Sequence, residues 1–469
     1  MSGLTVLKFG GTSVADAVAF ERVAGIVRAH GGPRVVVVVS ALAGMTDALL
    51  ACAAVRVEGE AAHARRHLNE QLERHAAIAR RLLGDDAAAG FRAELADART
   101  RIADLLDRLD GQAGERPALQ DEIVSYGERL SASLLAATLR RAGLPARYVD
   151  ARRCLTTDDT HGRATPLLRE TEHRTRAELL PLLQDGLAPV LGGYIAATRD
   201  GVTTTLGRGG SDYTAALVGA ALEADEIQIW TDVSGVLTAD PRVVADARPI
   251  PRLSYREAAE LAYFGAKVLH PKTIEPATQR GIPVRICNSR APQDPGTVVA
   301  AQPDIWPGAV KAIAHKTGIT VLQIASSRML GGYGFLRALF EVFERHRTVV
   351  DVVTTSEVSV SLTLEDAQSL PAIAGELQAL GEVTVEPHRA IVCVVGEGLR
   401  TTPGIAARVF ATVQDINVSL ISQGASRVNL TFVVEEAHVR EAVQRLHRAL
   451  LQPERASVGA GGAAGAVDR

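Results

Sequence analysis

The sequence predicts an α/β fold with a mainly parallel sheet over about the first 300 residues, followed by a duplicated α+β module. Two observations support this prediction. Short runs rich in Val and Ile alternate with helical patterns through the first part of the chain. Beyond it, Gly334, Phe340, Ser356 and Val358 each have a match 70 residues later, and both copies follow the order strand, helix, strand, strand, helix.

Composition excludes several classes of protein. The 469 residues are 47% hydrophobic, which is enough for a large core and more than one domain. A formal net charge of −3 provides no polybasic surface, so we expect neither nucleic acid nor membrane as a partner. The four cysteines are far apart and form no CxxC pair, which excludes zinc ribbons, thioredoxin-type redox motifs and a disulfide framework. No apolar run approaches the roughly 20 residues of a membrane span, and residues 1–11 lack the pattern of a signal peptide, so we expect a cytoplasmic protein.

Six segments have the length and composition of parallel strands: 4–9, 34–40, 146–150, 188–195, 226–231 and 283–287. Helical patterns at 15–30 and 211–223 lie between them, so right-handed crossovers are expected. Ligands then bind at the carboxyl ends of the strands. Residues 58–109 are rich in Ala, Arg and Glu and predict a helical hairpin with a break near 84–90.

Domain boundaries follow from these patterns. The prolines, glycines and polar residues of 289–307 predict a linker. The predicted parts are a first domain at 1–295 with an inserted hairpin at 58–110, two repeats at 308–389 and 390–453, and a flexible tail at 454–469. His63 and His67 in the hairpin have the i, i+4 spacing of metal ligands, but no carboxylate pattern accompanies them, and a solvated helix face is favoured. We predict no metal-ligating residue.

The first motif, Lys8-Phe9-Gly10-Gly11-Thr12-Ser13, follows a predicted strand and precedes a predicted helix. Its glycines let backbone N–H groups approach an anion, the helix N-terminus adds positive potential, and Lys8 supplies a point charge. It therefore predicts a phosphate site, although a turn made for packing is the alternative. The lysine precedes the glycines, so the motif is not a Walker A loop. Only five of the 51 basic residues are lysines, which favours a specific need for an ammonium at such positions.

Two further motifs carry chemistry. Residues 203–213 contain three glycines, and Arg208 in this segment can bind a carboxylate through two parallel hydrogen bonds. Asp212 can orient a lysine or hold Mg²⁺, although a capped glycine-rich connector is the alternative. The strand end at Thr231 and Asp232 suits a nucleotide base and ribose. Lys267, which follows a glycine, can reach the phosphates, whereas His270 is given a structural role.

Taken together, these motifs resemble those of the aspartate kinases, which are members of the amino-acid kinase family. The sequences KFGGTSV, TTLGRGGSDYTA and FGAKVLHP occur in the family's order, and the two repeats are similar to ACT regulatory domains. The resemblance implies a three-layer α/β/α sandwich followed by two ferredoxin-like ACT domains. The chain resembles the monofunctional aspartate kinases, because no dehydrogenase sequence follows the repeats. The implied activity is MgATP-dependent phosphorylation of the β-carboxylate of L-aspartate to 4-phospho-L-aspartate, the first step toward lysine, threonine, methionine and diaminopimelate.

The resemblance also implies roles for particular residues. Catalysis is expected of Lys8, Asp212 and Lys267. The nucleotide is expected to contact Lys8, Gly10, Gly11, Ser13, Thr231, Asp232, Leu237, Arg242 and Lys267, and aspartate to contact Ser40, Ala41, Thr46, Glu128, Arg208 and Ser211. Physical chemistry supports the second set, because a zwitterion needs a cation for its α-carboxylate and an anion for its ammonium. The β-carboxylate is ionised at neutral pH, so no general base is required.

The repeats look most like those of the lysine-sensitive class, which implies feedback regulation and at least a dimer through the ACT domains. The implied effector contacts are Met329, Gly332, Gly334, Phe335, Leu336, Val350, Asp351, Thr355 and Ser356. Gly332 stands where lysine-sensitive relatives often have serine, so lysine is favoured but threonine, or both together, stays open. Leu237 stands where many relatives have tyrosine, which is expected to affect ATP affinity. The alternatives are repeats that only dimerise, a sensor that has lost catalysis, and a kinase of glutamate or another acid.

Overall fold

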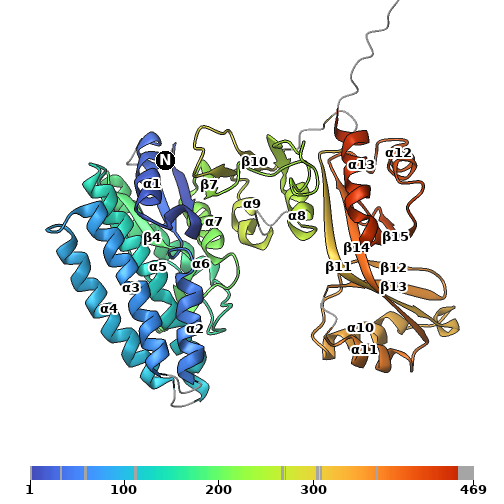
Figure 1. Cartoon of the computed structure of the whole chain (residues 1–469), viewed down its shortest axis with the longest axis horizontal. Coiled ribbons are helices and arrows are strands. Elements are labelled where there is room, and N and C mark those ends of the chain that lie inside the picture. The colour runs from blue at the N-terminus through green and yellow to red at the C-terminus, as the bar shows by residue number, and fades with distance from the viewer. Residues whose placement is uncertain are drawn as a thin grey trace, which may run out of the picture. The chain divides into compact units, whose positions relative to one another are not determined.

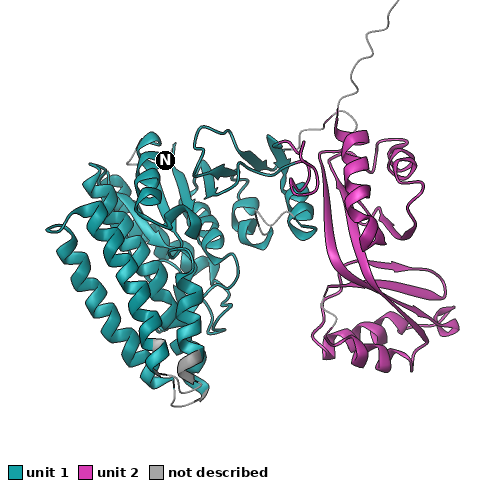
Figure 2. Ribbon diagram, viewed as in Figure 1, with its two compact units in different colours: residues 1–237, 249–304 teal, residues 238–248, 305–469 magenta. Residues whose placement is uncertain are grey.

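The computed structural model describes residues 3–31, 34–57, 61–109, 113–265, 269, 271–302, 306, 309–365 and 368–452. The chain divides into two compact units (Figure 2). Unit 1 comprises residues 1–237 and 249–304, and unit 2 comprises residues 238–248 and 305–469. Within the described ranges, no helix has the length and apolar character needed to span a membrane. The predicted tail at 454–469, Lys267 and His270 lie outside the described residues.

Unit 1 is built on an eight-stranded sheet with the order β3-β4-β2-β1-β7-β9-β10-β8. Its strands are β1 (Thr5–Phe9), β2 (Val35–Val39), β3 (Ala146–Val149), β4 (Ala188–Gly192), β7 (Glu226–Thr231), β8 (Arg252–Ser254), β9 (Val284–Asn288) and β10 (Thr297–Ala300). Neighbouring strands are parallel except for β9 and β10. The predicted mainly parallel sheet is confirmed.

Helices cover both faces of this sheet and complete three layers (Figure 1). On one face, Leu7, Phe9, Val35, Val37 and Val39 share a core with α1 (Ala17–Ala29), α2 (Met45–Val57), α3 (Ala61–Leu83), α4 (Ala88–Arg108) and α5 (Arg116–Arg141). On the other face lie α6 (Leu168–Gln184) and α7 (Gly210–Leu222), and α7 approaches Val6 through Gly219. Two short helices, α8 (Tyr255–Tyr263) and α9 (Glu275–Gln279), follow. The three-layer α/β/α sandwich is as expected.

The structure confirms one local prediction and corrects two others. The helical hairpin is confirmed as α3 and α4, with its break at 84–87. The predicted strand at 188–195 is instead divided between β4 and β5 (Ile195–Ala197), because Tyr194 adopts a positive φ of 67° that turns the chain. Strand β5 pairs with β6 (Thr203–Thr205) in a separate hairpin. The predicted linker at 289–307 contains β10, which joins the sheet through antiparallel pairing with β9.

Unit 2 contains a six-stranded antiparallel sheet with the order β12-β13-β11-β14-β16-β15. Its strands are β11 (Ala312–Ala325), β12 (Val353–Thr355), β13 (Ser359–Leu364), β14 (Glu382–Val395), β15 (Val418–Gln423) and β16 (Asn429–Glu435), and its helices are α10 (Phe335–Arg345), α11 (Leu370–Leu377), α12 (Ile405–Thr412) and α13 (Val439–Leu451). Strands β11 and β14 both have 14 residues, and Gly334 and Gly404 begin α10 and α12 with φ of 82° and 78°. The predicted repeat is therefore confirmed.

The boundary between the repeats differs from the predicted one. Residues 312–316 of β11 pair with residues 391–395 of β14, and Ala309, Val310 and Ile313 belong to the core of the second repeat. Residues 320–325 of β11 pair with β13, and Leu322 and Ile324 belong to the core of the first repeat. The second repeat is therefore discontinuous, because each long strand contributes apolar side chains to both cores.

Residues 238–248 also depart from the predicted domain plan. Ala239 and Val244 of this segment are buried in the core of the second repeat. Burial of these apolar side chains favours the packing of the segment with unit 2 rather than unit 1. Three side chains of α13 bind it. The guanidinium of Arg440 donates to the Arg242 carbonyl at 3.0 Å, the amide of Gln444 donates to the Val243 carbonyl at 2.8 Å, and His447 Nε2 lies 2.9 Å from Thr238 Oγ1. The segment is thus an excursion from unit 1 that folds with unit 2.

Candidate active site

A pocket of about 660 Å³ lies in unit 1, beyond the carboxyl ends of β1 and β2. Its position agrees with the rule for ligands of parallel sheets. Nine of the predicted site residues line it: Lys8, Gly11, Ser40, Ala41, Thr46, Glu128, Arg208, Ser211 and Asp212. These residues come from four separate stretches of sequence, so the fold brings together all six predicted aspartate contacts and two of the three predicted catalytic residues.

Lys8 and Asp212 form an ion pair in this pocket. Lys8 is near the end of β1, and its Nζ lies 2.6 Å from Oδ1 of Asp212 in the first turn of α7. Only 11% and 15% of the two side chains are exposed. The residue before α7, Gly209, has a left-handed φ of 73°, which only glycine adopts at little cost, and so lets the helix begin beside β1. The pair holds an ammonium at the pocket wall in a fixed position.

Glu128 lies on α5 and is 3% exposed. Its Oε1 accepts a hydrogen bond from the Ala41 N–H at 3.4 Å, whereas its Oε2 has no hydrogen-bond partner among the described residues. Burial raises the pKa of Glu128 to about 8, although hydrogen bonds from the Ala41 N–H and the Thr46 hydroxyl oppose the shift. A buried carboxyl group with one unpartnered oxygen can receive a cationic hydrogen-bond donor from a ligand.

Arg208 is exposed at the pocket rim, on the loop between β6 and α7. Sequence reasoning missed the residue that holds this loop. Asp121 accepts hydrogen bonds from the Thr205 hydroxyl at 2.7 Å and from the N–H groups of Thr205 at 3.2 Å and Gly162 at 3.0 Å. Its Oδ2 also lies 2.8 Å from His161 Nδ1. Asp121 precedes Glu128 by two helical turns on α5, but an aspartate within a long helix gives no local sequence signal of this role.

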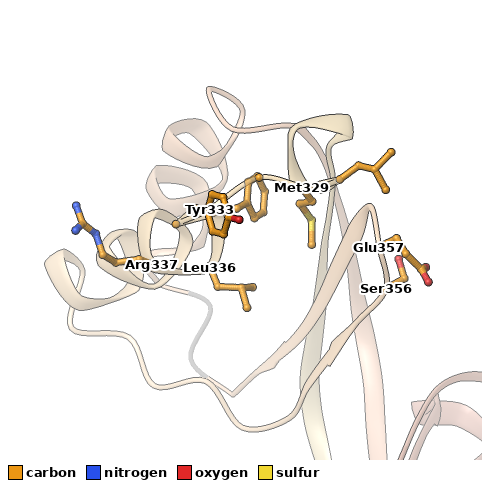
Figure 3. Close-up of a pocket in the computed structure, with 11 residues that line it drawn as sticks. Met329, Tyr333, Leu336, Arg337, Ser356 and Glu357 are labelled. Carbon is orange, nitrogen blue, oxygen red and sulfur yellow. The ribbon is translucent and has the colours of Figure 1, made fainter.

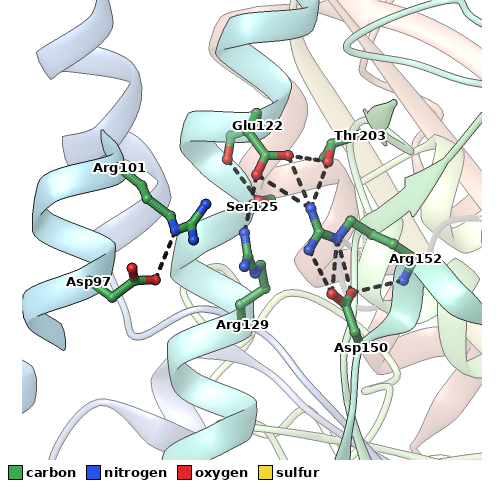
Figure 4. Close-up of polar contacts among 8 residues, drawn as sticks. All are labelled: Asp97, Arg101, Glu122, Ser125, Arg129, Asp150, Arg152 and Thr203. Atoms are coloured by element: carbon green, nitrogen blue, oxygen red, sulfur yellow. Dashed lines mark hydrogen bonds and ion pairs between the residues drawn. The ribbon is translucent and has the colours of Figure 1, made fainter. Parts of the chain in front are cut away.

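A second set of contacts fixes β6 on α5 (Figure 4). The Nη1 of Arg152 donates to Glu122 on α5 at 3.1 Å and to the Thr203 hydroxyl on β6 at 2.9 Å. The Thr203 hydroxyl also donates to Glu122, and Arg152 binds Asp150 through both of its oxygens. Burial alone would raise the pKa of Asp150, but the hydrogen bonds from Arg152 outweigh it and lower that pKa. The strand that leads to Arg208 is therefore attached to the helix that carries Glu128.

Several predicted nucleotide contacts do not line this pocket. The Gly10 N–H donates to the Trp230 carbonyl at 3.1 Å, and Ser13 is fully buried with its hydroxyl 2.8 Å from that of Ser289. Thr231 and Asp232 lie at and just beyond the carboxyl end of β7, beside β1, and the Thr231 hydroxyl donates to Asp232 at 3.2 Å. Leu237 is half-buried.

Arg242 differs from all of these because it belongs to unit 2. Its exposed guanidinium binds Asp240 through two parallel hydrogen bonds, the shorter of which is 2.7 Å.

A second pocket, of about 430 Å³, lies in unit 2 at the start of α10 (Figure 3). Of the predicted effector contacts it includes Met329, Gly332, Gly334, Phe335, Leu336 and Ser356. Val350, Asp351 and Thr355 do not line it. The Asp351 carboxylate is 5% exposed and lies 3.4 Å from Lys316 Nζ, so it is already paired with a cation. A Cβ at Gly332 would lie 2.3 Å from the Arg328 carbonyl oxygen, so a serine at this position would require the backbone to shift.

Comparisons with known proteins identify the family of this chain. The amino acid kinase family matches residues 3–288, and the ACT domain matches residues 392–450. Lysine-sensitive aspartokinase 3 of Escherichia coli (strain K12) is 39% identical over 460 residues, which cover 96% of this chain and all of that protein. The chloroplastic aspartokinase 1 of Arabidopsis thaliana is 38% identical over 96% of this chain and 81% of that protein.

Two solved structures of E. coli aspartokinase III are also similar. The complex with lysine and aspartate (T-state) has a TM-score of 0.80 and 39% sequence identity, and the complex with aspartate and ADP (R-state) has 0.79 and 38%. Each similarity covers 96% of this chain and 100% of the other. This chain therefore belongs to the aspartokinases of the amino acid kinase family.

Proposed function

We propose that this protein is an aspartate kinase that converts L-aspartate and MgATP into 4-phospho-L-aspartate and ADP. An oxygen of the β-carboxylate forms a bond to the γ-phosphorus while the bond from that phosphorus to the bridging oxygen breaks. The observation that carries the proposal is the unpaired carboxylate of Glu128 in the same pocket as the Lys8–Asp212 ion pair. The pocket thus has a receptor for an ammonium and a cation for a transferring phosphoryl group.

The pocket residues suit the two ends of aspartate. Glu128 receives the α-ammonium, which supplies the cation that its buried carboxylate lacks. Arg208 at the rim binds the α-carboxylate through its planar guanidinium. Ser40, Ala41, Thr46 and Ser211 line the remaining wall and complete the binding of the substrate.

The residues after β1 and at the start of α7 suit the phosphates. Lys8 with the backbone of Gly11 stabilises the charge on the phosphoryl group, and Asp212 holds the ammonium of Lys8 in place. Thr231, Asp232 and Leu237 bind the nucleoside, with Arg242 and Lys267 as its further contacts. The nucleophile is already ionised, so no residue needs to remove a proton.

Mg²⁺ is the expected partner of the nucleotide. The ion commonly binds through one or two carboxylates together with substrate phosphates, and Asp212 offers a carboxylate in the pocket. Within the described residues, no group of three or more His, Cys, Asp or Glu is placed to hold a metal ion. When bound, Mg²⁺ neutralises phosphate charge during the transfer.

An assay of ADP release with aspartate and glutamate in parallel tests this proposal. We expect turnover to require both aspartate and ATP. Because glutamate is longer by one methylene group, its kcat/KM should be at least about tenfold lower than that of aspartate. Turnover with glutamate alone would identify a kinase of another acid. Absence of turnover with both, in a protein that still binds aspartate, would identify a sensor that has lost catalysis.

For unit 2, we propose a regulatory role in which the pocket at the start of α10 binds an end-product amino acid, with lysine favoured by the relatives. The backbone N–H groups at the start of α10 suit the carboxylate of such a ligand. Large apolar side chains are exposed around the pocket, and Leu330 and Tyr333 are 70% and 104% exposed. Such a patch favours a second copy of the chain as its cover.

Inhibition measured with lysine, threonine and both together identifies the effector. Sedimentation analysis with and without the effector tests the dimer. A monomer at micromolar concentration that lysine nevertheless inhibits would overturn the dimeric part of the proposal and leave the effector pocket standing.

A further inference from the structure

The helical hairpin of unit 1 reaches the pocket through one side chain. Arg74 lies on α3, and its Nη1 donates to the carbonyl oxygen of Ala43 at 2.7 Å, while its Nη2 donates to the carbonyl oxygen of Ala15 at 2.9 Å. Ala43 lines the pocket in the segment that follows β2. Ala15 directly follows the 3-10 helix Gly11–Val14 after β1. One guanidinium therefore joins two segments that come from neighbouring strands.

The two segments also touch each other beside the pocket. A Cβ at Gly11 would lie 3.0 Å from the Ala41 carbonyl oxygen and 3.4 Å from the Ala43 Cα. Because glycine places no side chain between them, the two backbones are in direct contact. Their spacing sets the distance between a ligand bound after β1 and a ligand bound after β2.

Helix α3 holds Arg74 firmly. Leu72 and His75 on either side of it are 1% and 0% exposed and pack within unit 1. The Nδ1 of His75 lies 2.8 Å from the Gln71 carbonyl oxygen, and burial lowers the pKa of His75 to about 4. This imidazole is therefore neutral at physiological pH. The positive charge next to the carbonyl oxygens of Ala15 and Ala43 is therefore that of the Arg74 guanidinium.

We infer that Arg74 is a positioning residue for phosphoryl transfer, which rests on the proposed function. It fixes the spacing between residues 10–14, which hold the phosphates, and residues 40–44, which hold aspartate. A planar guanidinium can bind two carbonyl oxygens at once in a fixed geometry, whereas an ammonium binds as a point charge. Because a misplacement of about 1 Å between reacting groups costs up to roughly 100-fold in rate, loss of Arg74 acts on kcat.

Two substitutions at Arg74 and one control test this role. Arg74→Met keeps the apolar stem but removes both donors, and Arg74→Lys keeps the charge. We expect Arg74→Met to lower kcat by roughly tenfold or more with KM for aspartate and for ATP changed by less than about threefold, and Arg74→Lys to recover part of the loss. Arg99→Met removes an exposed guanidinium that pairs with Glu73 at 3.0 Å in the same hairpin. It should leave kcat within about twofold, because exposed pairs contribute little.

Hydrogen exchange supplies a readout that does not depend on activity. Amides in 10–15 and 40–44 should exchange faster in Arg74→Met and at the original rate in Arg99→Met. Unchanged kcat and unchanged exchange in Arg74→Met, or an equal loss in Arg99→Met, would overturn the role of Arg74. If Arg74→Met does not fold, Arg74→Lys decides the question, since an intermediate kcat at unchanged Tm supports the role and an unchanged kcat contradicts it. An unaltered protein without aspartokinase activity would count against the proposed function, and the exchange comparison would still test Arg74.

Discussion

Unit 1 and unit 2 each contain a pocket, but the charged side chains in the two pockets are held differently. In unit 1, Lys8 and Glu128 are 9% and 3% exposed, Lys8 already has Asp212 as its partner, and Glu128 is left without a cation. In unit 2, the pocket is lined by glycines and exposed side chains such as Tyr333, and its two charged residues, Arg337 and Glu357, are exposed.

The difference separates the two proposed activities. The first pocket is organised by the fold of one chain, because Lys8, Asp212 and Glu128 are held by a strand and two helices of unit 1. The second pocket has one well-defined wall, formed by the start of α10, and exposed apolar side chains elsewhere. Catalysis is therefore expected to depend on single side chains of unit 1, and effector binding on an additional surface.

The largest effect is expected at the ion pair of the first pocket. Lys8→Ala or Asp212→Ala should lower kcat by about 10³-fold while the protein stays folded, because each removes a preorganised charge at the transferring phosphoryl group. ADP release and circular dichroism measure the two quantities. Arg101→Ala, which breaks an exposed pair with Asp97, is the matched control and should retain full activity. A near-normal kcat in Lys8→Ala would show that the first pocket is not the site of transfer.

A smaller loss is expected at Asp121, whose carboxylate organises the loop that carries Arg208. Asp121→Asn keeps the shape of the side chain but replaces one of the two acceptor oxygens with an amide group that donates. We expect kcat/KM for aspartate to fall roughly 10- to 100-fold, since such supporting contacts have effects of this order. Asp97→Asn on the hairpin should have no effect. Equal values for Asp121→Asn and the unaltered enzyme would mean that the loop is held by its backbone alone.

The pH dependence of aspartate binding tests the buried carboxylate. Glu128, with a pKa of about 8, is protonated in the empty pocket at neutral pH, and it must ionise to pair with the ammonium. KM for aspartate should therefore rise as the pH falls, by about fivefold between pH 8 and pH 7. Calorimetry in buffers of different ionisation enthalpy should detect release of a proton on binding. A KM that is constant over this range would contradict the assignment.

Glu128 also makes a prediction about stability. Its folded-state pKa of about 8 lies above the unfolded value, so its contribution destabilises the folded state progressively as the pH rises from about 4.3 to about 8 and is constant above that. Glu128→Gln should therefore raise Tm at pH 8 while it weakens aspartate binding. An equal or lower Tm in this variant would show that the burial of the charge is relieved in some other way.

The smallest effect on catalysis is expected in unit 2. Gly332→Ser places a Cβ against the Arg328 carbonyl oxygen and must displace the backbone of the pocket. Inhibition by the effector should weaken by roughly tenfold with kcat unchanged, because the change leaves unit 1 untouched. Dose–response curves at fixed substrate concentration measure this. A parallel loss of kcat would indicate that the two pockets are not separable in the way described.

Motif chemistry allowed much of the first pocket to be predicted, because strand ends followed by glycines mark where a parallel sheet binds ligands. Lys8, Arg208 and Asp212 were placed in this way. Asp121 was not, since an aspartate within a long helix has no local signal, and its partners Gly162 and Thr205 are distant in sequence. The offset of 70 residues predicted the repeat, but the sharing of β11 and β14 between two cores depends on strand pairing that no single segment encodes.

The excursion at 238–248 has a practical consequence for dissecting the molecule. The chain crosses between the units three times, after Leu237, after Arg248 and after Asp304, so a protein truncated at residue 304 would retain this segment without the helix and core that receive it. The apolar side chains of Ala239 and Val244 would then be exposed to solvent, and we expect the isolated kinase portion to aggregate. Replacing the segment by a short polar turn between Leu237 and Pro249, which already pair as a β-bridge, is a better starting point for preparing that portion alone.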